Sequence, residues 1–375
     1  MYEHQDILHK LNQPLPLKEK LVSAHSAIRQ LHPFIARIAV TLYDPDTRVL
    51  KTYLHSSGDD NPIEHYQALL DKAHSLKEIL DKGKPRVINN MVTFENGQNE
   101  HTQRIGRQGY AASYTIPMYH DGNFFGFLFF NSYEKNVFTE VVLRDLDVYG
   151  HLISLTVLND ISVIKTMSAA IKTSNDIIHS RDPETGSHLD RMSRYSRLIA
   201  TTLAEKYQLS DSYIEHVFMF APLHDIGKIS IPDEILLKPG ALNENEMEIM
   251  KMHTVKGREM IDKIIGNFDL GDIKNIDILR NVALYHHEAV NGTGYPSGKS
   301  GDEIPLEAKI VAVADVFDAL TSRRSYKQAW PNDDAINMLK KMSNELLDQD
   351  CVNALVGNMD EVIRIQNTFK EDWLG

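Results

Sequence analysis

The sequence has 375 residues, of which 42% are hydrophobic and 25% are charged, and its formal net charge at pH 7 is −12. This length predicts two domains and a connector, and the composition is typical of a soluble globular protein. The acidic balance argues against binding of polymeric nucleic acid, which depends on a dense basic surface. The single cysteine, Cys351, excludes an internal disulfide and a cysteine-based metal site.

Membrane insertion and export are not expected. No stretch approaches the ~20 uninterrupted apolar residues of a membrane span. The start, from Met1 to Asp6, lacks the basic flank and apolar core of an export signal. We therefore expect a cytoplasmic protein with no membrane partner.

Residues 1–140 predict an α+β domain. A short leading helix is expected before residue 32, interrupted by Pro14 and Pro16. Alternating apolar residues predict a hairpin over 38–54 and a second hairpin over 110–131, whose turn signal is Asp121-Gly122. Between the hairpins, the pattern predicts a helix over 66–82 that ends at Gly83, and then a short strand over 85–88.

This layout, followed by a long helix, resembles a GAF domain, a sensory module that binds a small ligand or dimerises. The resemblance implies a possible small-molecule ligand, which the sequence does not identify; a purely dimerising role fits equally well. The phenylalanines of 124–130 are interpreted as core, because they alternate along a predicted strand.

Residues 141–180 predict a helical connector, because this stretch contains no proline and only one glycine. Its apolar residues recur at sevens and fours, which predicts a seam that packs on a second copy as a homodimeric coiled coil. The alternative is an amphipathic helix that lies on one of the domains. The seam residues are Leu146, Ile153, Val157, Ile164, Ile171 and Ile178.

Residues 181–375 predict an all-α bundle, in which ligands on facing helices can build a metal site. His224-Asp225 ends an apolar helix, where a buried carboxylate is costly unless it is paired or metal-bound, and the two oxygens of Asp225 suit a bridge between cations. His286-His287 precedes a glycine-rich turn, and adjacent imidazoles reach one metal only where the backbone changes direction. The helical segments are 189–206, 212–224, 244–260, 276–286, 306–320 and 333–347.

Further acidic and imidazole side chains lie one helical turn apart. Asp182-Pro183 predicts a helix start that puts Glu184 and His188 on one face. Asp315 and Asp318 lie in the apolar helix 308–320, so they require nearby cations.

The run His224-Asp225-Ile226-Gly227-Lys228, followed by His286-His287-Glu288 and Gly294-Tyr295-Pro296, resembles the HD-GYP family of cyclic di-GMP phosphodiesterases. The resemblance covers roughly residues 180–345. It implies an HD-type helical bundle that hydrolyses cyclic di-GMP to pGpG, with the further step to GMP left open. The metal ligands that it implies are Glu184, His188, His224, Asp225, His253, His286, His287 and Asp315.

Two or three divalent ions are expected at these ligands. Nitrogen and oxygen donors without thiolate favour iron, with manganese next. Resemblance to the members that carry a glutamate at position 184 implies three ions. Asp225 and Lys228 are the expected catalytic residues, Asp225 as the bridge and Lys228 as a phosphate contact or proton donor.

The resemblance also implies a substrate-binding segment at Arg324, Tyr326 and Lys327, and it places Gly294 and Tyr295 at the entrance. A solvated basic helix end is the alternative for the segment, and structural tightening of the loop is the alternative for the turn. Two other functions fit the motifs: hydrolysis of another cyclic dinucleotide such as cyclic GMP-AMP, or a catalytically weak adaptor that binds cyclic di-GMP. The complete ligand set disfavours the adaptor.

Overall fold

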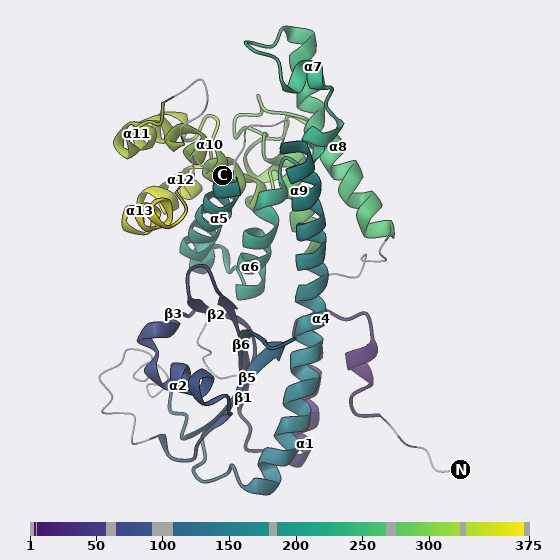
Figure 1. Cartoon of the computed structure of the whole chain (residues 1–375), viewed down its shortest axis with the longest axis vertical. Coiled ribbons are helices and arrows are strands. Elements are labelled where there is room, and N and C mark those ends of the chain that lie inside the picture. Colours follow the sequence, from purple (N-terminus) through teal and green to yellow (C-terminus); the bar gives the residue numbers. More distant parts are fainter. Residues whose placement is uncertain are drawn as a thin grey trace. The chain divides into compact units, whose positions relative to one another are not determined.

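The computed structural model describes residues 4, 6–57, 65–91, 108–179, 186–267, 275–322 and 328–370, with the side chains of 163–179 described only at Thr166 (Figure 1). The chain divides into two compact units, Met1–Ser162 and Val163–Gly375. The division falls inside α4 (Glu140–His179), a helix of 40 residues. Within the described ranges, no helix has the length and apolar character that crossing a membrane requires.

Unit 1 is built on a six-stranded antiparallel sheet with the order β3-β2-β1-β6-β5-β4. Both predicted hairpins are confirmed, and the turn between β5 and β6 has positive φ at Asp121 (48°) and Gly122 (78°), as a tight hairpin turn requires. The strands are β1 (Arg37–Asp44), β2 (Val49–Ser57), β3 (Gln67–Leu69), β4 (Arg86–Ile88), β5 (Ala112–His120) and β6 (Asn123–Ser132).

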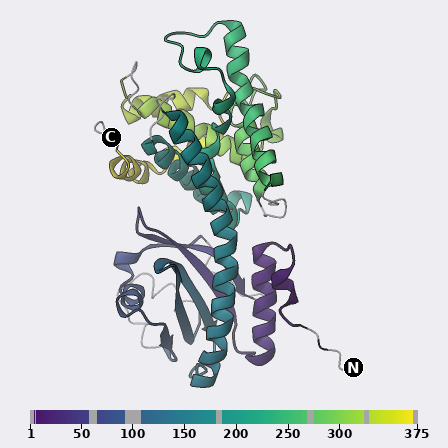
Figure 2. The same ribbon diagram turned by 45° about the vertical axis from the view of Figure 1, so that its right-hand side comes forward.

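The two faces of this sheet are covered by different helices (Figure 2). Side chains such as Val40 and Phe130 pack with α1 (Leu17–Leu31) and the first part of α4. Phe127 and Phe129, on the opposite face, pack with α2 (His74–Lys82). The interpretation of these phenylalanines as core is therefore confirmed.

Two expectations for unit 1 are wrong in detail. The segment 66–82 is not one helix, because Gln67–Leu69 extends the sheet by pairing with β2, and a 3₁₀ turn, η2 (Leu70–Lys72), precedes α2. The leading segment forms only a short 3₁₀ turn, η1 (His9–Asn12), and the longer helix α1 follows Pro16. Proline tolerates this position because its missing N–H and fixed φ suit a helix start.

The expected seam of the connector is also wrong over its first half. Leu146, Ile153 and Val157 are 0%, 3% and 1% exposed, and they pack in the core of unit 1 rather than facing a second copy. This matches the alternative of a helix that lies on a domain. The remaining seam side chains, Ile164, Ile171 and Ile178, lie outside the described side chains.

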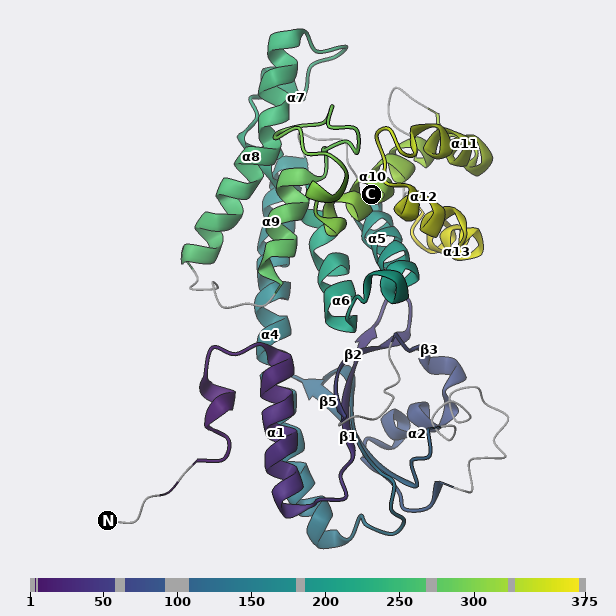
Figure 3. The ribbon, with the colours of Figure 1, turned by 180° about the vertical axis from the view of Figure 1, so that it is seen from behind.

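Unit 2 is helical in its described elements, as predicted (Figure 3). The elements are α5 (Gly186–Tyr207), α6 (Asp211–Phe220), η4 (Ala221–Leu223), η5 (Ile226–Ser230), α7 (Asp233–Leu236), α8 (Glu244–Asn267), α9 (Ile276–Tyr285), η6 (Gly301–Glu303), α10 (Leu306–Thr321), α11 (Asn332–Met342), α12 (Gln349–Val356) and α13 (Met359–Thr368). The predicted helix 212–224 is thus divided into α6 and the 3₁₀ turn η4, which has Pro222 in its first turn, and α7, α12 and α13 were not predicted.

Gly227 permits the close approach of η5 to α8. A Cβ atom at this position would lie 1.8 Å from the carbonyl oxygen of His253 and 2.4 Å from the backbone nitrogen of Gly257. Backbone atoms of a helix cannot move aside cheaply. The glycine therefore fixes the distance between the His224-Asp225 segment and the helix that carries His253.

We expect Gly227→Ala to destabilise unit 2 by about 1–3 kcal/mol or more, because the added methyl group overlaps backbone atoms of α8. Gly266→Ala, on α8 itself, is the matched control, because a Cβ atom there meets no atom within 4 Å. That control should be neutral, or more stable by up to about 1 kcal/mol. Chemical denaturation of both variants measures the difference, and equal stability of Gly227→Ala and wild type would contradict the close approach.

Candidate metal centre

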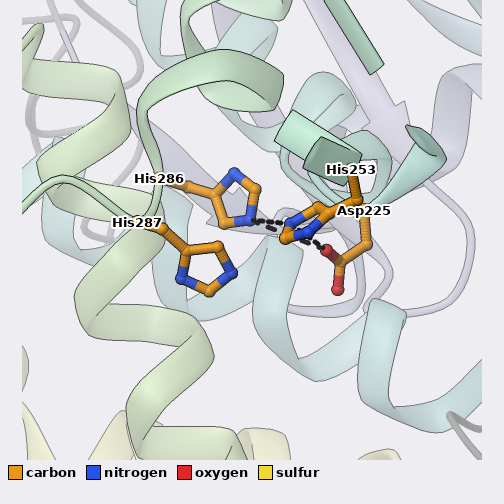
Figure 4. Close-up of side chains that lie close together, drawn as sticks. All are labelled: Asp225, His253, His286 and His287. Carbon is orange, nitrogen blue, oxygen red and sulfur yellow. Dashed lines mark hydrogen bonds and ion pairs between the residues drawn. The ribbon is translucent and has the colours of Figure 1, made fainter. Parts of the chain in front are cut away.

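Several elements of unit 2 bring histidine and aspartate side chains to one place. His224 and Asp225 lie between η4 and η5, and His253 lies on α8. His286 and His287 directly follow α9, where the helix ends and the chain turns. Figure 4 shows the rings of His253, His286 and His287 gathered near the Asp225 carboxylate. The predicted convergence of these motifs is thus present in the structure.

The Asp225 carboxylate lies between histidines on both of its oxygens. Its Oδ1 is 3.2 Å from Nε2 of His253 and 3.6 Å from Nε2 of His286. Its Oδ2 is 3.1 Å from Nε2 of His224 and 2.8 Å from the Lys228 ammonium. The two oxygens therefore face different sets of side chains, which is the arrangement that a bridging carboxylate needs.

Hydrogen bonds to backbone carbonyls orient three of the histidines. Nδ1 of His224 donates to Ala221 at 3.0 Å, Nδ1 of His253 donates to Met250 at 2.8 Å, and Nδ1 of His286 donates to Val282 at 2.9 Å. In the neutral imidazole, a proton on Nδ1 leaves the lone pair on Nε2. The local backbone thus sets the tautomer, and each free lone pair lies on the nitrogen that approaches Asp225.

His188 on α5 is oriented by a carboxylate instead. Its Nδ1 is 2.8 Å from Oδ2 of Asp318, and its Nε2 is 3.9 Å from Oδ1 of Asp315. Asp318 has no exposed surface and also receives two hydrogen bonds from Arg191, at 2.7 and 2.9 Å, and one from Ser322 at 2.9 Å. A carboxylate behind a histidine fixes its ring and raises its basicity as a ligand.

The charges of the site are set by burial and by these contacts. Burial would raise the pKa of Asp225, but Lys228 and His224 outweigh it and hold that pKa well below its usual range. Burial lowers the pKa of His286 and, with the neighbouring His286 ring, lowers that of His287 well below the usual value. Burial would likewise raise the pKa of Asp318, but His188 and Arg191 lower it. The lowered pKa values keep the Asp225 carboxylate ionised and the imidazoles of His286 and His287 neutral, the forms that bind metal ions.

These side chains form two groups that could each hold a metal ion. In the first group, Asp225, His253, His286 and His287 offer ligand atoms that lie within 4.8 Å of one another, and in the second group His188, His224 and Asp315 do so. The donors are imidazole nitrogen and carboxylate oxygen, a set that suits first-row divalent metals. The residues present therefore fit bound metal ions, and Asp225, a member of the first group, also has its Oδ2 3.1 Å from Nε2 of His224 in the second group.

The structure places the remaining predicted residues as follows. Tyr295 stacks on the ring of His287, with centroids 4.8 Å apart, and its backbone N–H donates to the carbonyl of His287 at 3.1 Å. A Cβ atom at Gly294 would lie 2.2 Å from the nitrogen of Ala289, so this glycine permits close backbone contact. Four predicted site residues, Glu184, Arg324, Tyr326 and Lys327, lie outside the described residues.

Sequence reasoning missed Arg191 and Ser322, which hold Asp318. Arg191 is 5% exposed and also donates to the backbone carbonyl of Phe369 at 3.0 Å. Its spacing of three residues from His188 on α5 puts both side chains on one face of the helix. That spacing, together with Asp318 in an apolar helix, was a signal from which the ion pair of Arg191 and Asp318 could have been predicted.

Comparison with known proteins identifies similar sequences and structures. The cyclic di-GMP phosphodiesterase response regulator RpfG of Xanthomonas campestris pv. campestris is 44% identical over 192 residues, which are 51% of this chain and 48% of that protein. A cyclic di-GMP phosphodiesterase of Thermotoga maritima is 38% identical over 53% of this chain and 51% of its own. The 3'3'-cGAMP-specific phosphodiesterase 2 of Vibrio cholerae is 32% identical over 62% of this chain and 43% of its own.

The chain thus spans about half the length of the relatives that it matches. Among solved structures, the phycocyanobilin-bound GAF domain from a cyanobacterial phytochrome matches 41% of this chain and 90% of its own, with a TM-score of 0.34 and 16% identity. Residues 172–351 match the family described as HD domain. These residues are therefore similar to HD domains, in agreement with the family resemblance of the His224-Asp225 and His286-His287 motifs, which lie within them.

Proposed function

We propose that this protein is a metal-dependent phosphodiesterase that hydrolyses cyclic di-GMP. The observation that carries the proposal is the Asp225 carboxylate, which lies between two groups of histidines that could each hold a metal ion. Relatives that are 44% and 38% identical carry the name cyclic di-GMP phosphodiesterase, which supports the same activity.

The residues of the site have distinct roles in this proposal. Metal ions bound there would supply a nucleophile at neutral pH and neutralise charge on the phosphodiester. Asp225 bridges the two ligand groups, and Lys228, whose Nζ lies 2.8 Å from Oδ2 of Asp225, contacts the phosphate or gives a proton to the leaving oxygen. The proposed substrate contacts are Arg324, Tyr326, Lys327, Tyr295 and Gly294.

Iron is the proposed metal, with manganese next, because the donor set combines imidazole and carboxylate and contains no thiolate. The two ligand groups among the described residues account for two ions. We assign a third ion to Glu184, which is one helical turn before His188 in the sequence. The proposed product is pGpG. Further hydrolysis of pGpG to GMP is the step that we expect to depend most on the number of bound ions.

Cyclic GMP-AMP is the second candidate substrate. The cGAMP-specific relative from Vibrio cholerae is 32% identical, against 44% for the regulator RpfG. The different names within this set of relatives mean that sequence similarity does not itself choose between the two cyclic dinucleotides. A weakly catalytic adaptor is the third candidate, and the complete set of described ligands makes it the least favoured.

The exposed face of α4 supports a homodimer. Val141, Val148 and Leu155 recur every seven residues and are 67%, 62% and 61% exposed, so they form an apolar stripe that the described part of the chain leaves exposed. Apolar residues at this spacing are typical of a helix that pairs with a second helix. We therefore propose that the connector dimerises through this stripe, which is a different face from the seam predicted from the sequence.

We predict that Asp225→Asn removes hydrolysis of cyclic di-GMP and lowers the metal content. The neutral amide offers one oxygen donor and no negative charge, so it cannot bridge two cations in the same way. Asp360→Asn is the control, because Asp360 is an exposed aspartate at the start of α13. Elemental analysis and product chromatography measure both effects. Full turnover with unchanged metal content in Asp225→Asn would contradict the proposed function.

Glu184→Ala should lower the metal content from three ions per chain to two. The variant should still bind cyclic di-GMP but hydrolyse it more slowly or stop at pGpG, because one cation fewer acts on the phosphate. Metal analysis and product analysis of the folded variant provide the measurement. If the variant and the wild type contain equal numbers of ions and give equal rates, Glu184 is not a ligand.

Leu155→Glu should convert the dimer to a monomer, since it places a charge in the apolar stripe of α4. Leu155→Met is the matched control and should remain dimeric, because it keeps an apolar side chain of similar volume. Sedimentation equilibrium distinguishes the two states. A dimer of unchanged affinity in Leu155→Glu would show that this stripe is not the interface.

A further inference from the structure

His287 differs from the other histidines of the site in how its ring is held. His188, His224, His253 and His286 each have Nδ1 in a hydrogen bond, to Asp318 or to a backbone carbonyl. For His287, the described part of the chain shows ring contacts and no hydrogen bond to either nitrogen. Its orientation therefore depends on packing.

The ring that packs flat on His287 is that of Tyr295. The two centroids are 4.8 Å apart with an angle of 29° between the rings. His286 and His253 contact other parts of the imidazole, at centroid distances of 4.1 and 5.1 Å. His287 is thus enclosed by three rings, of which only Tyr295 comes from the loop after the histidine pair.

The backbone of this loop returns to the histidine pair. The Tyr295 N–H donates to the carbonyl of His287 at 3.1 Å. Next to it, a Cβ atom at Gly294 would lie 2.5 Å from the same carbonyl oxygen, so only glycine allows the approach. The position of Tyr295 therefore depends on how this loop is closed.

The Glu288 side chain closes the loop. It is 5% exposed, its Oε1 accepts the backbone N–H of Ser297 at 2.8 Å, and its Oε2 accepts that of Lys299 at 2.9 Å. Hydrogen bonds to a charged acceptor are stronger than neutral ones. One carboxylate, adjacent in sequence to His287, thus ties down the chain directly after Tyr295.

We propose that Glu288 is a positioning residue: by closing the loop onto its two oxygens, it holds Tyr295 against His287 and so orients this imidazole toward the metal group. The loop closure stands on the contacts above, whereas the consequence for metal binding rests on the proposed function. In this role the Tyr295 ring holds the imidazole of His287, a proposed metal ligand, in place.

The test compares Glu288→Gln and Glu288→Ala with Glu303→Gln. Glu303 is the matched control, because its carboxylate also accepts a backbone N–H, that of Ser300 at 3.1 Å. Unlike Glu288, it is exposed and is not adjacent in sequence to His287. In metal-free protein, the readouts are hydrogen exchange at the Ser297 and Lys299 amides and the NMR contact between the labelled rings of His287 and Tyr295. Titration with Mn²⁺ is the third readout.

We expect both Glu288 variants to speed exchange at the two amides, to weaken the contact between the rings and to lower Mn²⁺ affinity by about 10- to 100-fold, the usual effect of removing a group that orients a ligand. Glu288→Gln should show the smaller change, since it keeps one acceptor oxygen. Glu303→Gln should behave as wild type. Thermal unfolding measures whether each variant is folded. If Glu288→Ala does not fold, the comparison uses Glu288→Gln, which is the milder change.

Unchanged exchange at Ser297 and Lys299 would overturn the closure of the loop by Glu288. Faster exchange with an unchanged contact between the rings, or with Mn²⁺ affinity equal to wild type, would overturn the positioning of His287. Failure of wild-type protein to bind Mn²⁺, Fe²⁺ or any other divalent ion would contradict the proposed function instead, and the two metal-free readouts would still decide the role of Glu288.

Discussion

The largely buried carboxylate of Asp225 is the constraint on which the helical unit depends. A carboxylate that is only 15% exposed is costly unless cations or hydrogen bonds compensate its charge. Here Lys228 and three imidazoles, those of His224, His253 and His286, lie within 3.6 Å of its oxygens. Lys228 and His224 come from the segment around η5, His253 from α8 and His286 from the end of α9, so these three parts of the chain must converge for the charge to be satisfied. The same convergence creates two groups of metal-ligating atoms on either side of one carboxylate.

The histidines show how backbone geometry prepares a site for chemistry. His224, His253 and His286 each donate from Nδ1 to the carbonyl of a residue three or four positions earlier, an acceptor that helical structure provides. Such a bond chooses the tautomer without any further side chain. His188 uses Asp318 for the same purpose, and Arg191 extends that contact to the carbonyl of Phe369 after α13. The orientation of His188 therefore depends on elements far apart in sequence, whereas that of the other three depends on the local helical backbone.

The sequence could predict the fold class and the clustering of ligands, because its strongest signals are local. His224-Asp225 and His286-His287 are adjacent pairs at the ends of apolar runs, and the hairpin turn at Asp121-Gly122 needs only two residues to be recognised. The face of α4 could not be predicted in the same way. Periodic spacing of Leu146 and Ile153 shows that a face is buried but does not name its partner, and here the partner is the sheet of the same unit. β3 was missed because Gln67–Leu69 is too short for an alternating pattern. The sequence motif includes Glu288 but could not predict its role, because its partners are backbone N–H groups nine and eleven residues later, which depend on the path of the loop.

In the proposed function, Asp225 stands between metal ions that together hydrolyse a cyclic dinucleotide. The most direct measurement is turnover of cyclic di-GMP by wild-type protein as it is titrated with Fe²⁺ or Mn²⁺ from the metal-free state, with bound ions counted at each point. We expect hydrolysis to pGpG to appear only when the second ion per chain binds, because one ion fills a single ligand group. Full activity with one ion per chain, or no activity at any occupancy, would contradict it.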